Sequence, residues 1–324
     1  MLKASQLRSL ISAENISSGL LDKNFVRSKN EFDEFKDVSK GIPILIPADE
    51  TLFEFDDDDV FEVSLPELSA LIYGANAEAY IGFQSSFTTN RFVSSFKVRE
   101  EFLADFQRIE IENKRAINYV ANLRQTHKSV SAFQTRNIPH FGHQKIMDRM
   151  LARCDHLVVN PVLGPKKSGD ATIECLNAVF GDFFKSKFGG RISFMPVYAN
   201  MYYAGPREAV HHAILRRNMG FTGFSVGRDH AGAEDFFDPQ AATTLIKSLQ
   251  GALNIDVFCH MGAKHCLACD DYVISGECEH GLSELKDVSG SQFRHAISNS
   301  QVFEAADKDM QKYVFQNVKK IFED

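Results

Sequence analysis

The chain has 324 residues, of which 44% are hydrophobic and 24% are charged, and its formal net charge is −7. This composition is typical of a soluble globular protein of about two domains, and the negative charge argues against a general nucleic-acid-binding protein. No apolar run approaches the length of a membrane span, and residues 1–6 lack the apolar core of a secretion signal, so we expect a cytoplasmic protein without a membrane partner.

The first 128 residues have the pattern of a small α+β domain without a visible catalytic motif. Four aspartates at positions 56–59 lie between two apolar runs, which predicts a hairpin with a solvated acidic tip. These aspartates lack the alternating ligand spacing of a calcium loop. The expected elements are a helix over 5–13, a strand with prolines over 41–47, hairpin strands over 53–55 and 60–63, a strand over 91–98 and an amphipathic helix over 102–123.

From about residue 129 the pattern changes to alternating strands and helices, which implies a mostly parallel sheet with helices on both faces. Ligands of such sheets bind beyond the carboxyl ends of the strands. The first and fourth strands would therefore deliver residues 134–137 and 227–232 to one edge. Expected strands are 130–133, 156–162, 191–198, 223–227 and 255–258, and expected helices are 140–153, 170–186, 206–219 and 238–250.

Two common phosphate-binding motifs are missing from the sequence. There is no Gly-x-x-x-x-Gly-Lys-Ser/Thr loop and no Gly-x-Gly-x-x-Gly fingerprint. The chain is therefore predicted to be neither a P-loop kinase nor an ordinary dinucleotide dehydrogenase.

Residues 133–143, Phe-Gln-Thr-Arg-Asn-Ile-Pro-His-Phe-Gly-His, predict an anion site at the start of a helix. Proline is well suited to a first helical turn, and His140 and His143 would share one face of that turn beside unpaired backbone N–H groups. Arg136 supplies a planar, permanently charged fork in front of them. Taken alone, the two histidines also fit an exposed helix start.

This run and three later segments together resemble the ATP sulfurylases (sulfate adenylyltransferases). The resemblance extends over residues 131–295. Its later parts are Asn160-Pro161 with Gly164, Lys166, Gly169 and Asp170; Tyr203-Ala204-Gly205-Pro206-Arg207-Glu208-Ala209; Gly227-Arg228-Asp229-His230-Ala231-Gly232; and Ser289-Gly290-Ser291 with Arg294, in which serine replaces the usual threonine.

The resemblance implies three domains. Residues 1–128 would form a PUA-like α+β domain. Residues 129–258 would form a Rossmann-like nucleotidyltransferase domain of the HUP type, with a parallel sheet. Residues 259–324 would form a zinc-binding loop and a helical subdomain. A homodimer is expected.

The family's reaction is the transfer of an adenylyl group from ATP to sulfate, which gives adenosine 5′-phosphosulfate and pyrophosphate. By resemblance, Gln134, Arg136 and the backbone N–H of Ala231 would bind sulfate. The predicted catalytic residues are Asn137, Arg228, Arg136 and Thr135. The predicted ATP-binding residues are Gln134, Thr135, Arg136, Asn137, His140, His143, Gly227, Arg228, Asp229 and His230.

Other contacts to the nucleotide are less closely specified by the sequence. Mg²⁺ would arrive with ATP, so a metal cage built by the protein is not expected. Lys166 and Lys167 would either contact phosphate or form a solvated turn. Val257 and Phe258 are candidates for the adenine pocket.

Cys266-x₂-Cys269-x₈-Cys278-x-His280 is a separate signal, whose spacing predicts a structural zinc site with four protein ligands. His260 or His265 could replace His280 as the fourth ligand. The competing interpretation is a set of reduced thiols with incidental spacing. Disulfides are not expected in a chain of this size and class.

Two other functions fit the same residues. One is a nucleotidylyltransferase that uses a different oxyanion or a phosphorylated acceptor. The other is a catalytically silent module that binds a nucleotide or an oxyanion.

Overall fold

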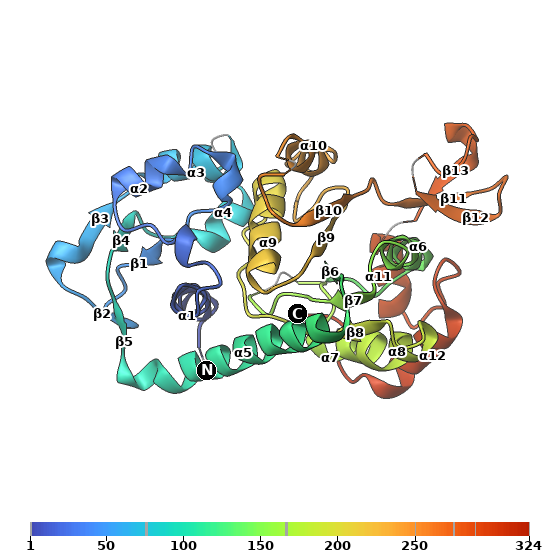
Figure 1. The fold of residues 1–324 in the computed structure, drawn as a ribbon, viewed down its shortest axis with the longest axis horizontal. Helices are drawn as coiled ribbons and strands as arrows, with labels where there is room; N and C mark the ends of the chain where they lie inside the picture. Colours follow the sequence, from blue (N-terminus) through green and yellow to red (C-terminus); the bar gives the residue numbers. More distant parts are fainter. Residues whose placement is uncertain are drawn as a thin grey trace.

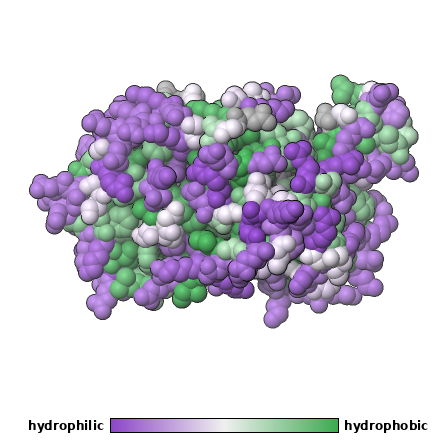
Figure 2. Space-filling model, viewed as in Figure 1, coloured by the Kyte–Doolittle hydropathy of each residue, from purple (hydrophilic) through white to green (hydrophobic). Residues whose placement is uncertain are grey.

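A computed structural model describes residues 2–74, 77–165, 168–249, 251–274, 276–288 and 290–323. The N-terminal region lies at one end, a parallel sheet lies in the middle, and a small β-subdomain protrudes at the other end (Figure 1). The face shown in Figure 2 is mostly hydrophilic, and its hydrophobic residues lie in separate patches. None of the helices in the described ranges combines the length and the apolar character that a membrane span needs.

The central sheet has five parallel strands in the order β10-β9-β6-β7-β8. In chain order this is 5-4-1-2-3, the strand order of doubly wound Rossmann-type sheets, with the switch point between β6 and β9. The prediction of a parallel sheet is confirmed, although most strands are shorter than expected. The strands are β6 (Val130–Phe133), β7 (His156–Val159), β8 (Ile192–Phe194), β9 (Gly223–Val226) and β10 (Asp256–Cys259).

The sheet separates two hydrophobic cores, because successive side chains of a strand point to opposite faces. Val130 and Ala132 of β6 belong to one core, and Phe133 belongs to the other. The helices around the sheet are α6 (Phe141–Leu151), α7 (Ile173–Leu176), η5 (Asn177–Phe183), α8 (Phe184–Lys187), α9 (Gly205–Asn218), α10 (Ala241–Ser248), α11 (Gly290–Ser298) and α12 (Lys308–Asn317).

The helix predicted over 170–186 begins later and is irregular. Ala171 forms a β-bridge with Phe322, so the chain is still extended there. The helix begins only after Thr172, whose hydroxyl accepts a hydrogen bond from Cys175 N–H. The π-helical segment η5 then interrupts the helix between α7 and α8.

The N-terminal region contains helices around two small sheets. The helices predicted over 5–13 and 102–123 are confirmed by α1 and α5. Its helices are α1 (Ala4–Ser17), η1 (Asp22–Asn24), α2 (Lys29–Glu34), η2 (Val38–Lys40), η3 (Asp57–Asp59), α3 (Leu65–Tyr73), α4 (Ile81–Ser86), η4 (Glu100–Phe102) and α5 (Leu103–Thr126). Its strands are β1 (Ile46–Pro47), β2 (Phe53–Glu54), β3 (Val60–Glu62), β4 (Arg91–Val93) and β5 (Lys97–Val98).

The predicted hairpin around the four aspartates is wrong. β2 pairs with β5 and β3 pairs with β4, so the two runs belong to different sheets. Asp59 explains the division of the strand predicted over 91–98, since its carboxylate accepts from the Ser94 hydroxyl and its carbonyl accepts from Ser94 N–H. The strand predicted over 41–47 is reduced to β1.

The protruding subdomain is an antiparallel sheet in the order β12-β11-β13, built from β11 (Ala263–Cys266), β12 (Asp271–Ile274) and β13 (Leu285–Asp287), with η6 (Leu282–Glu284) before β13. It lies beside α6 in Figure 1. Lys145 of α6 forms an ion pair with Asp271 at 2.7 Å, and Phe141 packs on the ring of Tyr272.

The N-terminal region is joined to α9 by a buried arginine. Arg207 donates hydrogen bonds to the carbonyl oxygens of Phe35, Gly41 and Leu71. Burial lowers the pKa of this guanidinium to about 10, so it stays charged at neutral pH. Three carbonyl groups that lie far from α9 in the sequence therefore share one side-chain donor.

We expect Arg207→Ala to lower the free energy of unfolding by about 3–5 kcal/mol. The substitution removes three hydrogen bonds donated by a buried charged group, each worth about 1.5–3 kcal/mol. Urea unfolding followed by circular dichroism measures the loss. Arg115→Ala on the exposed face of α5 is the control and should change stability by less than about 0.5 kcal/mol. Equal losses in both variants would contradict the anchoring role of Arg207.

Candidate active site

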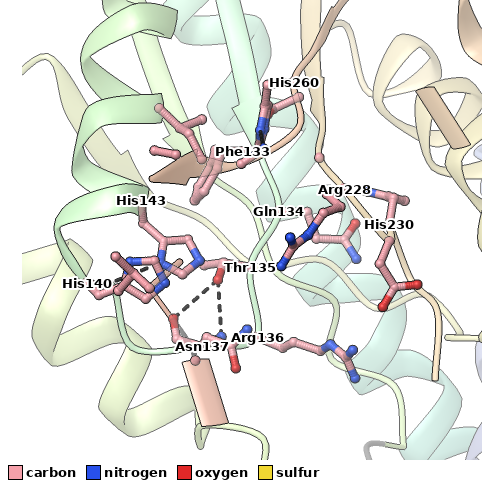
Figure 3. A pocket seen from close by; sticks show the side chains of 18 of the residues that line it. Phe133, Gln134, Thr135, Arg136, Asn137, His140, His143, Arg228, His230 and His260 are labelled. Carbon is pink, nitrogen blue, oxygen red and sulfur yellow. Dashed lines mark hydrogen bonds between the residues drawn. The ribbon is translucent and has the colours of Figure 1, made fainter. Parts of the chain in front are cut away.

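A pocket of about 520 Å³ opens at the carboxyl ends of β6 and β9, at the switch point of the sheet. Figure 3 shows the residues after β6 and the residues after β9 facing the same space. The predicted site residues that line it are Gln134, Thr135, Arg136, Asn137, His140, His143, Gly227, Arg228, Asp229, His230 and Ala231. Two segments 90 residues apart therefore meet in one pocket, as the sequence predicted.

The turn after β6 is held by short-range hydrogen bonds. The Thr135 hydroxyl donates to the Asn137 carbonyl at 3.2 Å and accepts from Asn137 N–H at 3.1 Å (Figure 3). Arg294 of α11 donates to the side-chain oxygen of Asn137 at 2.9 Å. Thr135 thus shapes the turn, and Arg294 fixes the orientation of the Asn137 amide.

Arg136 is held by partners from three distant segments. Its guanidinium lies 3.5 Å from the buried carboxylate of Asp170 and donates to the Gly232 carbonyl at 3.3 Å. It also lies over the ring of Tyr203, 5.6 Å from the ring centroid. In Figure 3 its side chain extends away from the two histidines. The pocket therefore has its fixed arginine and its imidazoles on different sides.

His140 and His143 cap the N-terminus of α6. His140 Nδ1 accepts from Gly142 N–H at 3.1 Å, and His143 Nδ1 accepts from His140 N–H at 3.4 Å. A nitrogen that accepts carries no proton, so in each neutral ring the proton is on Nε2. The helix cap thereby leaves Nε2–H of each ring as the hydrogen-bond donor for an anion.

Both imidazoles are neutral at physiological pH. Burial lowers the pKa of His140 to about 2, with a smaller contribution from His143, and burial lowers the pKa of His143 to about 4. The two rings therefore offer neutral N–H donors beside the helix N-terminus, and the full positive charges of the pocket come from its arginines.

The loop after β9 carries the second arginine of the predicted site. The Arg228 side chain is half exposed and lies 3.6 Å from the carboxylate of Asp287. Asp229 and Ala231 both have left-handed backbone conformations, with φ of 51° and 55°. A Cβ at Gly232 would lie 1.9 Å from Asp229 Oδ1, so any larger residue there would displace the Asp229 carboxylate.

His230 is held in place by two buried side chains of α9. Its Nε2 lies 3.1 Å from His212 Nδ1, and His212 Nε2 lies 3.3 Å from the buried carboxylate of Glu208. Burial lowers the pKa of both imidazoles well below the usual value. This chain of buried groups anchors the loop after β9 to α9, which indicates a positioning role for His230.

Other residues also line the pocket, and His260 and Asp287 among them belong to none of the motifs recognised in the sequence. His260 accepts from Gly262 N–H and lies 3.1 Å from the Ser225 hydroxyl, so it belongs to this pocket and not to the cysteine cluster. Asp287 comes from β13, more than 50 residues after Arg228. The remaining members are Phe133, Ile146, Met201, Met261, Ala263, Val288, Gly290 and Arg294.

Val257 and Phe258, the candidates for the adenine pocket, do not line this pocket; they line a separate groove at the edge strand β10. Lys166, Lys167 and Ser289 lie outside the described residues, as does the side chain of Ser291.

The cysteine motif forms a compact cluster in the protruding subdomain. One ligand atom from each of Cys266, Cys269, Cys278 and His280 lies within 4.8 Å of all the others. His280 Nδ1 is 3.4 Å from Cys266 Sγ and 3.3 Å from Cys269 Sγ. A tetrahedral zinc ion places such nitrogen and sulfur ligands about 3.5 Å apart, so the donor set fits this metal. His265 instead packs on Tyr272, outside the cluster.

The chain is similar to known proteins over about half of its length. The ATP-sulfurylase family model matches residues 117–314. Sulfate adenylyltransferase of Pyrococcus abyssi is 38% identical over 175 residues, which cover 54% of this chain and 46% of that protein. Sulfate adenylyltransferase of Staphylothermus marinus is 37% identical over 171 residues, 52% of this chain and 44% of that protein. The chain thus spans about half the length of these curated relatives.

A solved structure shares the fold. It is described as a hexameric APS kinase from Thiobacillus denitrificans; its TM-score is 0.56, and the match covers 98% of this chain and 62% of that chain. The identity is 12%, so this similarity concerns the fold alone.

We expect the free energy of unfolding to fall as the pH is lowered from 6.5 to about 4. Below pH 6.5 the unfolded chain takes up protons on histidines that burial keeps neutral in the folded chain, so acid favours unfolding. Each such histidine contributes up to about 1.4 kcal/mol per pH unit. They are His140, His143, His156, His211, His212, His230 and His260.

Urea unfolding at several pH values between 4.5 and 8 measures this dependence. In His143→Gln the slope near pH 5 should be shallower by about one proton, because glutamine does not titrate. An unchanged slope would show that His143 is not held neutral in the folded protein.

Proposed function

Because the chain belongs to the ATP-sulfurylase family, we propose that it is a sulfate adenylyltransferase, which converts ATP and sulfate to adenosine 5′-phosphosulfate and pyrophosphate. The observation that carries this proposal is the pocket at the sheet switch point, where Arg136 and Arg228 face one cavity with two neutral imidazole donors. A triphosphate and a small dianion need such a site, since each repels the other in the absence of compensating groups.

The proposed reaction is an in-line displacement. A sulfate oxygen forms a bond to the α-phosphorus, and the bond from that phosphorus to the oxygen bridging to the β-phosphate breaks. Pyrophosphate leaves with both electrons of the broken bond. Sulfate is already ionised at neutral pH, so no general base is required, and positioning with charge stabilisation supplies the catalysis.

On the sulfate side, we propose that Arg136, Gln134 and the backbone N–H of Ala231 bind the dianion. Arg136 suits this role because Asp170, Gly232 and Tyr203 hold its guanidinium in place before any ligand arrives. Such preorganisation avoids the cost of ordering a long side chain during binding.

On the nucleotide side, we propose that His140 and His143 donate Nε2–H to the β- and γ-phosphates, at the N-terminus of α6. Asn137 and Arg228 would stabilise the charge that develops around the α-phosphate. Arg228 would exchange its ion pair with Asp287 for the phosphate. Thr135, Gly227, Asp229 and His230 would complete the site by shaping the two loops. Mg²⁺ bound to ATP would offset part of the triphosphate charge.

We propose that Cys266, Cys269, Cys278 and His280 bind a structural zinc ion. Four protein ligands leave no open position, so the metal would stabilise the β11–β13 sheet without activating water. Both ends of the β11–β13 segment line the pocket. Met261 and Ala263 lie at the start of β11, and Asp287 is the last residue of β13. The metal would thus hold one wall of the nucleotide site.

We also propose fold types for the two larger regions of the chain. The strand order supports the HUP type of nucleotidyltransferase domain for residues 129–258. The α+β composition of residues 1–128 supports a PUA-like domain. The cytoplasmic location, the homodimer and the three domain boundaries stay predictions from the sequence.

We expect sulfate-dependent release of pyrophosphate from MgATP by the purified protein. Arg136→Ala should reduce kcat/KM for sulfate by at least a factor of about 100, because it removes a fixed positive donor from the reacting anions. His143→Ala should reduce kcat/KM for MgATP. Arg108→Ala on α5 is the control and should leave both values unchanged.

A coupled pyrophosphate assay distinguishes the three functions considered for these residues. If turnover requires a different acceptor, that acceptor takes the place of sulfate in the proposed reaction. Tight binding of ATP without turnover, for every acceptor tested, would identify a silent binding module.

We expect the purified protein to contain about one zinc ion per chain, measured by atomic emission. Cys266→Ser should lose the ion and lower Tm by about 5 °C or more, because the β11–β13 segment loses its cross-link through the metal. Cys259→Ser, outside the cluster, should keep it. Full zinc content in Cys266→Ser would contradict the proposed ligand set.

A further inference from the structure

A buried tyrosine of the N-terminal region connects two loops of the active site. Tyr80, the residue before α4, donates its hydroxyl hydrogen to the Tyr203 carbonyl at 2.8 Å. The same hydroxyl oxygen accepts from Ala233 N–H at 3.1 Å. One side chain therefore bridges the segment before α9 and the loop after β9.

The bond to Ala233 leads directly to Arg136. The N–H of Ala233 and the carbonyl of Gly232 belong to the same peptide group, and this carbonyl accepts from Arg136 Nη2 at 3.3 Å. The two polar groups of a trans peptide point in opposite directions. Tyr80 thus holds one side of the peptide while Arg136 binds its other side, and the consecutive hydrogen bonds strengthen one another.

The bond to Tyr203 leads to Arg136 by a second route. Tyr203 has a φ of 55°, a left-handed conformation that costs free energy for a residue other than glycine. Its carbonyl is held by Tyr80, and its ring lies under the Arg136 guanidinium. Both hydrogen bonds of Tyr80 therefore end at groups that contact Arg136.

The ring of Tyr80 is fixed by close packing. It stacks on Phe236 with centroids 4.4 Å apart. A Cβ at Gly82 in the first turn of α4 would lie 2.7 Å from the Tyr202 carbonyl oxygen, so the start of α4 packs directly on the segment that Tyr80 holds. Burial raises the pKa of the Tyr80 hydroxyl well above its usual value, which keeps it protonated and able to donate.

From this geometry we infer that Tyr80 is a positioning residue for Arg136, and that the N-terminal region thereby sets the affinity of the site for its oxyanion. Tyr80 does not line the pocket, so its effect on the anion passes through the Gly232–Ala233 peptide and the ring of Tyr203. The identity of the anion as sulfate rests on the proposed function.

The test is Tyr80→Phe, which removes both hydrogen bonds and keeps the ring on Phe236. The KM for sulfate should rise about tenfold, and the KM for MgATP should change less than twofold. Tyr73→Phe is the matched control, since it removes a buried hydroxyl of the same region that donates to the neighbouring Tyr202 carbonyl at 2.8 Å. This control should lower stability by a similar amount, with less than a twofold change in the KM for sulfate.

Three results would overturn the inference: an unchanged KM for sulfate in Tyr80→Phe, a parallel rise in both KM values, or equal rises for sulfate in the two variants. The last two would mean that the hydroxyl acts through general packing.

A measurement without turnover separates this inference from the proposed function. The side-chain N–H signals of Arg136, assigned by their loss in Arg136→Lys, should shift and exchange faster with water in Tyr80→Phe but not in Tyr73→Phe. This result supports the positioning role even if the wild-type protein releases no pyrophosphate with sulfate. Unchanged signals in Tyr80→Phe would refute the role even in an active enzyme.

Discussion

The burial of the polar helix α9 is the constraint on which the site depends, because each buried ionisable group there requires partners. Glu208 accepts N–H bonds from Tyr202 and Ala204 and contacts His212, which holds the loop after β9 through His230. Arg207 anchors the N-terminal region. Farther along α9, Arg216 donates hydrogen bonds to the backbone carbonyl and the side-chain oxygen of Asn160, the residue that follows β7. Many of these partners come from loops, so pairing the buried polar groups of α9 also fixes the loop after β9 beside the pocket.

The pocket contains two kinds of hydrogen-bond donor, charged guanidinium groups and neutral imidazoles. Arg136 and Arg228 are permanently charged, whereas the caps of α6 and burial keep His140 and His143 neutral. In the proposed reaction, the charged groups would lie where the two anions approach each other, and neutral N–H groups lie at the helix N-terminus. In that reaction, uncharged donors would bind phosphate oxygens while limiting how strongly the pyrophosphate product is retained.

Support for the site comes from segments far away in the sequence. Asp170 approaches Arg136 from a segment that pairs with the chain end through the Ala171–Phe322 bridge. Arg294 orients Asn137, and the cysteine-rich subdomain brings Asp287 to Arg228. The position of each arginine therefore depends on segments far away in the sequence.

The sequence alone determined the features that depend on local periodicity and spacing. It predicted the bounds of β6, the long helix α5, the parallel sheet, the meeting of residues 134–137 with 227–232, and the grouping of Cys266 with His280. Tertiary structure decided the features that depend on partners far along the chain: the strand pairing around the four aspartates, the anchoring of Arg207, and the hydrogen bonds of Tyr80. Local patterns specify which way a side chain faces, but not which distant group satisfies it.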